Sequence, residues 1–163
     1  MKAGSKFAII MVGISGSGKS TLASAMKEEC NEFHEINRDM IRFGQIAKGG
    51  DWSAWDWDKE PVVTECWNHE LDNAISLNLD LILSDTNLNL KYLNNTVGKL
   101  IKNEYAVHYI LMDIPVDECI KRDKLRGRFS VGEDVIQKQY NRFVSIRKDI
   151  INRENAHSIT LGD

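Results

Sequence analysis

Apolar residues along the chain fall into short continuous runs that alternate with stretches of helical periodicity. Residues 7–12 form the clearest run, which ends at Gly13 as a buried parallel strand would. Weaker runs predict strands at 33–36, 79–83, 105–112 and 158–161. Helical spacing predicts helices at 19–29, 38–43, 92–102, 116–125 and 133–151, and a long one from about residue 60, where Pro61 suits a first turn. This alternation predicts an α/β fold with a parallel sheet, helices on both faces, and ligands at the carboxyl ends of the strands.

The composition fits one compact domain. The 163 residues are 42% hydrophobic and 28% charged, and no stretch rich in glycine, serine or proline divides them, so we expect one domain over 1–163. The three cysteines lie far apart, as free thiols of a reducing compartment do. No apolar segment is long enough for a signal peptide or a membrane span, so we expect a cytoplasmic protein with no membrane partner. The sequence indicates no protein partner.

Residues 13–20, GISGSGKS, match the phosphate-binding pattern GxxxxGK[ST] in full. They lie between the first predicted strand and an amphipathic helix, which is the context that confirms the pattern. Glycines let successive backbone N–H groups surround phosphate oxygens, and the helix adds its positive N-terminus. We expect Lys19 to reach the β- and γ-phosphates of ATP and the Ser20 hydroxyl to bind Mg²⁺. The residues expected to bind ATP in this segment are Gly13, Ser15, Gly16, Ser17, Gly18, Lys19, Ser20 and Thr21.

Other classes of P-loop protein fit the sequence less well. A switch GTPase needs a base-reading NKxD-type element, which the sequence lacks. Motor and AAA+ ATPases usually end a strand with adjacent acids, whereas Asp85 is followed by Thr86. The chain is also short for either class. These differences favour a kinase.

Two segments are candidates for the acceptor side of such a kinase. Asp39 and Arg42 are three residues apart, so they share one face of a helical turn. A kinase needs a carboxylate to accept the hydroxyl proton and a cation to hold it, although an exposed ion pair would give the same spacing. Asp85 follows a predicted buried strand, where P-loop enzymes hold Mg²⁺ or orient an arginine, although Ser-Asp-Thr-Asn is also ordinary turn chemistry.

The net charge of −3 is unusual for a nucleic-acid binder, so contact with a polyanion would need a local basic cluster. One exists at Lys121, Arg122, Lys124, Arg126 and Arg128. Arg122 and Arg126 share a helix face, and Gly127 permits a hinge, so the segment could close over ATP as an arginine-bearing lid. A solvated basic helix face would have a similar pattern.

Three tryptophans, Trp52, Trp55 and Trp57, lie in a stretch without helical or strand periodicity. Large aromatic side chains are usually mostly buried, so one or two of them are expected to cover the core beneath a long loop. At least one ring could instead stack on a base beside the reacting hydroxyl. The neighbouring acids argue against a loop that follows phosphates.

Together these motifs resemble the kinase domain of the phage polynucleotide 5′-kinase/3′-phosphatase family. The matching stretches are residues 13–21, INRD at 36–39 with Arg42, SDTNLN at 84–89, and 113–127. The resemblance implies a sheet of strand order 2-3-1-4-5 and a lid that carries arginines. The sequence departs from the family pattern in four ways: it has no phosphatase motif DxDGT, only Lys91 supplies a cation after Asn89, Met40 replaces a second acid, and the tryptophan-rich stretch 49–58 has no match.

The resemblance also implies a role for each candidate residue. Asp39 would be the general base, acting with Lys19 and Arg126 in catalysis. The acceptor would be held by Arg42, Arg38 and Asp85, Mg²⁺ by Ser20 and Asp85, and the phosphates of ATP by Arg122 and Arg126 of the lid.

We therefore expect ATP- and Mg²⁺-dependent phosphorylation of a nucleic-acid hydroxyl, foremost a 5′-hydroxyl, with DNA favoured over RNA. A hydroxymethyl group on a pyrimidine base, as in phage DNA hypermodification, is the nearest alternative. A small-metabolite kinase is the third, favoured by the negative net charge. A non-enzymatic nucleotide-binding module is the last, because it would leave Asp39, Arg42 and Arg126 unexplained.

Overall fold

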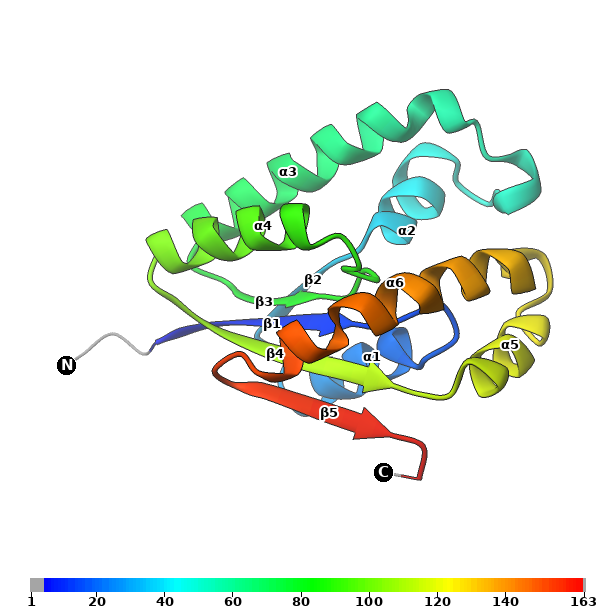
Figure 1. Cartoon of the computed structure of the whole chain (residues 1–163). Helices are drawn as coiled ribbons and strands as arrows, with labels where there is room; N and C mark the ends of the chain where they lie inside the picture. The colour runs from blue at the N-terminus through cyan, green and yellow to red at the C-terminus, as the bar shows by residue number, and fades with distance from the viewer. Residues whose placement is uncertain (1–4, 163) are drawn as a thin grey trace.

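The computed structural model describes residues 5–162, which are built around a parallel sheet of five strands in the order β2-β3-β1-β4-β5 (Figure 1). The strands are β1 (Lys6–Val12), β2 (Phe33–Ile36), β3 (Asp80–Leu83), β4 (Tyr105–Asp113) and β5 (Ala156–Thr160). Every neighbouring pair is parallel. The α/β fold class and the strand order that the resemblance implied are therefore confirmed.

Six α-helices connect or cover these strands. They are α1 (Lys19–Glu29), α2 (Arg38–Ile41), α3 (Glu60–Ser76), α4 (Leu90–Lys102), α5 (Val116–Lys124) and α6 (Glu133–Ile151). Most agree with the predicted helices to within two residues. The helix predicted at 38–43 differs, because α2 ends at Ile41 and a wider π-helical segment continues over Arg42–Ile46. Its widened turns begin at Arg42, whose guanidinium is bound by Glu60 of α3.

The two faces of the sheet carry unequal cores. Alternate residues of β1 point to opposite faces, so Ala8, Ile10 and Val12 join the larger core while Met11 joins the smaller one. The larger core lies beneath α3, α4 and α6, and the smaller one beneath α1 alone, as the positions of these helices in Figure 1 show. Helices therefore cover both faces, as predicted.

The carboxyl ends of the strands meet at one edge of the sheet, where four connecting segments come together. The P-loop follows β1, α2 follows β2, Asp85 follows β3, and α5 follows β4. The Gly13 N–H donates to the Thr86 carbonyl oxygen at 3.1 Å, which joins the P-loop to the segment after β3. This edge is where α/β proteins bind their ligands. Among the described residues, no helix has the length and apolarity needed to cross a membrane.

Candidate active site

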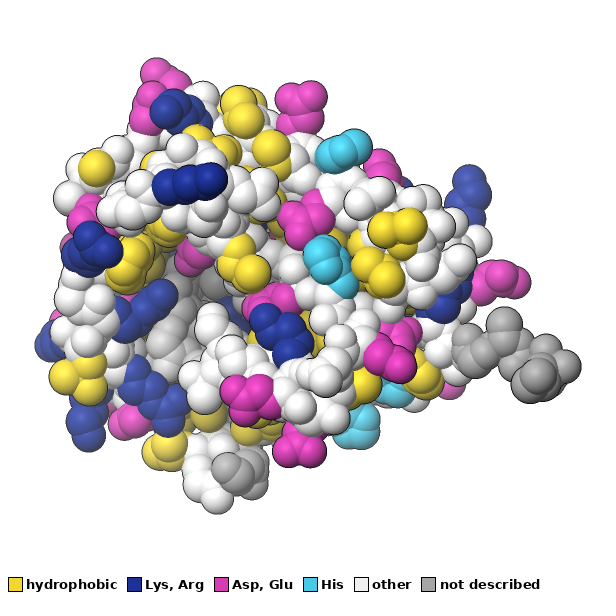
Figure 2. All heavy atoms as spheres, turned by 180° about the vertical axis from the view of Figure 1, so that it is seen from behind, with side chains coloured by type: hydrophobic (Ala, Val, Ile, Leu, Met, Phe, Trp, Pro, Cys, Tyr) yellow, Lys and Arg dark blue, Asp and Glu magenta, His cyan; other side chains and the backbone are white. Residues whose placement is uncertain are grey.

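One cavity of about 1390 Å³ lies at the carboxyl edge of the sheet. It is lined by residues of the P-loop, of α2, of the tryptophan-rich loop, of α5 and of α6. The space-filling view shows a hollow with Lys and Arg side chains around it (Figure 2). Its charged lining residues are the cations Lys19, Arg38, Arg42, Arg122, Arg126 and Arg142 and the acids Asp39 and Asp85. The cavity is therefore basic although the net charge of the chain is −3.

The P-loop backbone has little room for side chains at its tip. Gly16 has a φ of +81°, and a Cβ built there would lie 2.4 Å from the carbonyl oxygen of Cys119. Gly18 has a φ of +97° and precedes the first residue of α1. Both positions favour glycine because their φ values are left-handed, and at Gly16 the close backbone contact also excludes a Cβ. The N–H groups of these two glycines have no partner among the described residues and are open to an anion, whereas those of Gly13, Ser15 and Ser17 donate within the protein.

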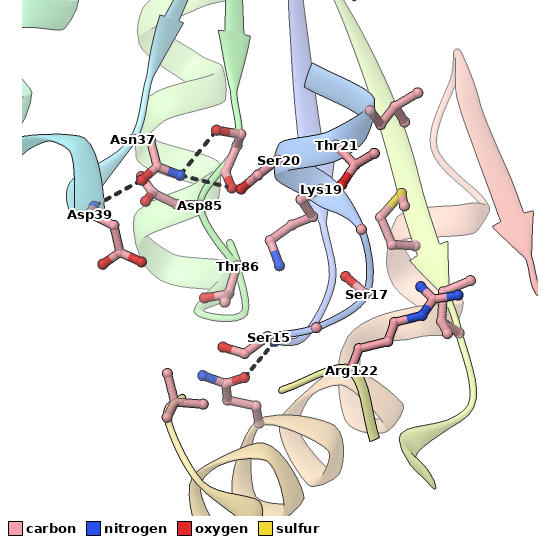
Figure 3. Close-up of a pocket in the computed structure, with 18 of the residues that line it drawn as sticks. Ser15, Ser17, Lys19, Ser20, Thr21, Asn37, Asp39, Asp85, Thr86 and Arg122 are labelled. Carbon is pink, nitrogen blue, oxygen red and sulfur yellow. Dashed lines mark hydrogen bonds between the residues drawn. The ribbon is translucent and has the colours of Figure 1, made fainter. Parts of the chain in front are cut away.

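The Ser17 side chain indicates how well this loop fits a phosphate. Its hydroxyl oxygen is buried, and no described residue gives it a hydrogen-bond partner. A buried hydroxyl without a partner costs free energy, so it marks a place where a polar ligand atom is expected. Ser17 lines the cavity beside Lys19 (Figure 3). The residues present therefore fit the phosphates of a nucleotide.

Lys19 is buried under the P-loop, where its ammonium donates to the Ile14 carbonyl oxygen at 2.8 Å. Burial lowers the pKa of Lys19 from its ordinary value of 10.5 to about 8, against the opposing effect of the nearby Asp85 carboxylate. Figure 3 shows Lys19 and Asp39 on opposite sides of one space, with Asp85 and Thr86 between them. A phosphate placed there would restore the favourable environment of the ammonium.

Asp39 and Arg42 form the ion pair that their spacing predicts. Arg42 Nη1 donates to Asp39 Oδ1 at 2.7 Å. The same guanidinium binds Glu60 of α3 through two bonds, from Nε to Oε1 at 2.6 Å and from Nη2 to Oε2 at 3.0 Å. Arg42 keeps further N–H groups that these bonds leave unused. The pair is therefore not a simple exposed helical contact, because Glu60 fixes the arginine at the wall of the cavity.

Asp85 has both of its carboxylate oxygens engaged by the protein. Oδ1 accepts the backbone N–H of Arg38 at 2.8 Å, and Oδ2 accepts the indole N–H of Trp67 at 2.9 Å. Burial raises the pKa of Asp85 above its ordinary value, although these two bonds oppose the shift. Asp85 thus holds the start of α2 in place. The Arg38 side chain is directed to Thr64, which accepts from Nη1 and Nη2 at 3.1 Å each.

Asn37 caps α2 and brings Asp39 to the cavity wall. Its side-chain oxygen accepts the Asp39 N–H at 2.8 Å, while its amide donates to Ser84 (Figure 3). Such a cap fixes the direction of a short helix. Among the described residues no cluster of three or more acids, histidines or cysteines could hold a metal. Mg²⁺ at a P-loop needs few protein ligands because phosphates and waters supply the rest, so Ser20 and Asp85 stay its predicted ligands.

The lid is shaped by the buried carboxylate of Asp123. It accepts three hydrogen bonds from the returning chain: from the Ser130 hydroxyl at 2.6 Å and from the backbone N–H groups of Val131 and Gly132 at 3.0 Å each. Arg126 also lies near this carboxylate, with Nη1 3.5 Å from Oδ1. These contacts hold the pKa of Asp123 below its ordinary value, against its burial. Gly127 has a φ of +58°, so the chain does turn sharply beside Arg126.

The two lid arginines line the cavity, as the sequence predicted. Arg122 Nε donates to Glu118 at 2.9 Å, and its Nη1 would lie 3.7 Å from a Cβ at Gly18. Figure 3 shows Arg122 next to the P-loop. The three other cations of the predicted cluster, Lys121, Lys124 and Arg128, do not line the cavity. Gly13 does not line it either, because its N–H is bound to Thr86.

The three tryptophans have different surroundings. Trp55 is buried in the core, and its indole donates to Glu60. Trp57 is 63% exposed and stacks on Trp52, with ring centroids 5.7 Å apart and an interplanar angle of 18°. Trp52 and Trp57 line the same cavity as Asp39. The structure thus places one ring in the core, as expected, and an exposed ring at the cavity, while stacking on a base stays a prediction.

Three cavity residues of α6 and one supporting residue escaped sequence reasoning. Gln139 and Arg142 of α6 line the cavity with Val135, at helical spacing that could have been found once α6 was known to face the P-loop. Glu60 lies at the start of a predicted helix, where an acid is explained by its favourable interaction with the helix dipole. No local signal connects these residues with the P-loop or with Arg42.

Comparison with known proteins places the chain among P-loop kinases. The family model described as an AAA domain (AAA_33) matches residues 9–146. The adjacent acids of AAA+ ATPases are nevertheless absent after β3, where Thr86 follows Asp85. A protein of Autographa californica nuclear polyhedrosis virus is 28% identical over 153 residues, which cover 87% of this chain and 21% of that protein. That protein is named a bifunctional polynucleotide kinase/RNA ligase, and the two activities in this name are inferred.

Solved structures agree on the fold. A chain of the Pnkp1/Rnl/Hen1 RNA repair complex matches with a TM-score of 0.74 and 23% identity over 88% of this chain and 46% of that one. A gluconokinase from Sinorhizobium meliloti 1021 matches with a TM-score of 0.60 and 16% identity over 98% of this chain and 85% of that one. The chain thus spans about a fifth of the viral relative and under half of the repair-complex chain.

Proposed function

We propose that the chain, which belongs to this AAA domain family, is a P-loop kinase of the polynucleotide-kinase type and transfers the γ-phosphate of ATP to a 5′-hydroxyl of a nucleic acid. We further propose that residues 1–163 act as one kinase domain. The RNA ligase named for the viral relative falls outside this proposal, since the chain spans only 21% of that protein.

The observation that supports this proposal is the continuity of the cavity from donor to acceptor side. Its P-loop end offers Lys19, Ser17 and open backbone N–H groups, while its other end offers Asp39, Arg42 and the Trp52–Trp57 pair. At about 1390 Å³ it exceeds the roughly 300–1,000 Å³ of ordinary small-molecule sites. It therefore has room for ATP and for the end of the acceptor strand.

The proposed reaction assigns a step to each group. Asp39 accepts the proton of the attacking hydroxyl, and its ion pair with Arg42 fixes the position of the carboxylate. Lys19 and Arg126 stabilise the charge on the transferred phosphoryl group, with Arg122 beside them. Mg²⁺, when bound, neutralises the β- and γ-phosphate oxygens. Arg42 uses its unused N–H groups to hold a phosphate of the acceptor strand, which explains why a 5′-terminal nucleotide would be preferred to a simple alcohol.

A hydroxymethylated pyrimidine in DNA is a second candidate acceptor, and the Trp52–Trp57 pair favours it. An exposed aromatic pair beside the general base could hold an extruded base by stacking. The gluconokinase and a deoxyadenosine kinase from M. mycoides, at 16% and 18% identity, share only the fold and give no support to a small-metabolite acceptor.

Phosphorylation of defined acceptors with γ-labelled ATP distinguishes these functions. The acceptors are 5′-hydroxyl oligonucleotides of DNA and of RNA, a hydroxymethyluracil-containing duplex with blocked 5′ ends, and free nucleosides with gluconate. Labelling of the 5′-hydroxyl strands, abolished by EDTA and by Lys19→Ala, supports the proposal. Label only on the blocked duplex, or only on the small molecules, would refute it.

A further inference from the structure

Gln139 joins α6 to the P-loop through a contact that the proposed reaction does not use. Its side-chain Oε1 accepts the backbone N–H of Ser15 at 2.8 Å (Figure 3, dashed line at Ser15). The core-facing side of α6 is formed by other residues, Ile136, Phe143, Ile146 and Ile150. Gln139 instead lines the cavity together with Val135 and Arg142. A polar side chain at this position faces the ligand space.

The peptide group that Gln139 binds is also bound by the P-loop lysine. Ser15 N–H and the Ile14 carbonyl belong to one peptide unit, and that carbonyl accepts from Lys19 Nζ at 2.8 Å. Gln139 and Lys19 therefore hold the two ends of the same peptide. Because a P-loop lysine serves the β- and γ-phosphates, the Gln139 amide lies at the terminal-phosphate end of the cavity.

The orientation of the amide follows from this contact. Ser15 N–H is a donor, so the oxygen of the Gln139 amide must face it and the NH₂ group must face the other way. Within residues 5–162 no partner of that NH₂ group is found. The amide thus has its acceptor satisfied and its two donors available to the cavity.

We propose that Gln139 binds the terminal phosphate of the donor: its Oε1 stays anchored on Ser15 N–H and its Nε2 donates to a γ-phosphate oxygen, so that the protein tells ATP from ADP at this side chain. The proposal rests on the donor half of the proposed function and is independent of the acceptor. It also connects the lid with the phosphate. Asp123 of the lid binds the Gly132 N–H immediately before α6, and α6 is the helix that carries Gln139.

The test is calorimetric binding of a non-hydrolysable ATP analogue and of ADP, both with Mg²⁺ and without any acceptor. Gln139→Leu removes both amide functions, and Gln139→Glu keeps an acceptor for Ser15 N–H but loses the donor and adds negative charge. Gln137→Leu is the matched control, because Gln137 is exposed on the outer side of the same helix. A melting temperature for each variant reports whether the fold is kept.

We expect both Gln139 variants to bind the ATP analogue about 10-fold or more weakly, the range for a hydrogen bond to a charged group, with Gln139→Glu the weaker. ADP affinity should change little, so that the ratio of the two affinities falls, and Gln137→Leu should match the wild-type protein. Tighter binding of the analogue by Gln139→Leu would overturn the proposal, because Gln139 would then be a plug that competes for Ser15 N–H. Equal losses for both nucleotides would also overturn it. Failure of the wild-type protein to bind either nucleotide would instead refute the donor assignment itself.

Discussion

Protonation of Lys19 should make nucleotide binding depend on pH in a predictable direction. In the free protein, burial places the pKa of Lys19 at about 8, whereas its ordinary value is 10.5. Phosphates bound beside the ammonium favour its charged form, so the pKa should return toward the ordinary value when ATP binds. Binding then selects protonated Lys19, and ATP affinity must fall as the pH rises through about 8.

The size of this effect follows from the two pKa values. The protonated fraction of Lys19 in the free protein falls from about nine-tenths at about pH 7 to about one-tenth at about pH 9, while in the complex it stays near one. ATP affinity should therefore drop about 10-fold over that range, and binding at about pH 9 should take up roughly 0.9 proton. Burial likewise raises the pKa of the neighbouring Cys119 thiol, to about 11, so this thiol does not titrate there.

Calorimetry in buffers of different ionisation enthalpy measures both quantities. Mg²⁺ is kept in excess so that the nucleotide itself does not titrate over the range. Lys19→Met is the control, since it removes the titrating group and retains most of the packing. An ATP affinity that is constant over this range in the wild-type protein, or an equal decrease in Lys19→Met, would show that Lys19 is not the group linked to binding.

Three further predictions concern the other groups of the site. Asp39→Asn should lower turnover by about 10²–10⁴ with little change in ATP affinity, because the amide cannot accept a proton; loss of ATP binding with turnover retained would place Asp39 on the donor side. Arg126→Ala should lower turnover, and Arg126→Lys should restore only part of it, since lysine lacks the planar fork; full activity of the lysine variant in a steady-state assay would reduce Arg126 to a surface charge. Trp57→Ala should raise the acceptor KM about 5- to 150-fold at an unchanged melting temperature, whereas Trp55→Ala should lower that temperature; a Trp57→Ala variant that is only less stable would make the exposed ring structural.

The parts of the site that the sequence could predict are those that local spacing determines. The P-loop is a contiguous pattern, and Asp39 and Arg42 lie one helical turn apart, so each needs only its own segment to be recognised. The contacts that complete the site join distant segments. Gln139 binds Ser15 across 124 positions, and Glu60 binds Arg42 across 18. Such contacts depend on how α6 and α3 pack on the sheet, which periodicity does not specify.

The tryptophan-rich loop illustrates the same limit at the level of packing. Its composition indicated that the rings would differ in burial but gave no rule for which one enters the core. In the structure, the Phe43 ring packs edge-on against Trp52, Trp55 and Phe129, with ring centroids 5.1–5.8 Å apart, and these contacts join segments that the sequence does not connect. Phe129 lies just after Gly127 in the lid, so a residue far along the chain packs on Phe43 beside the tryptophan-rich loop.

The Asp123 contacts have a consequence for the thermodynamics of nucleotide binding. Ordering a mobile backbone costs about 1–2 kcal/mol of conformational entropy for each residue. In this chain the segment after the lid, residues 130–132, is already fixed by its three hydrogen bonds to Asp123. Its conformational entropy is therefore lost when the protein folds and not when the ligand binds. We therefore expect nucleotide binding to show the small heat-capacity change of two preformed surfaces meeting. Asp123→Ala, in a protein that still folds, should convert this into binding coupled to local folding, with a more negative heat-capacity change and a larger entropic cost.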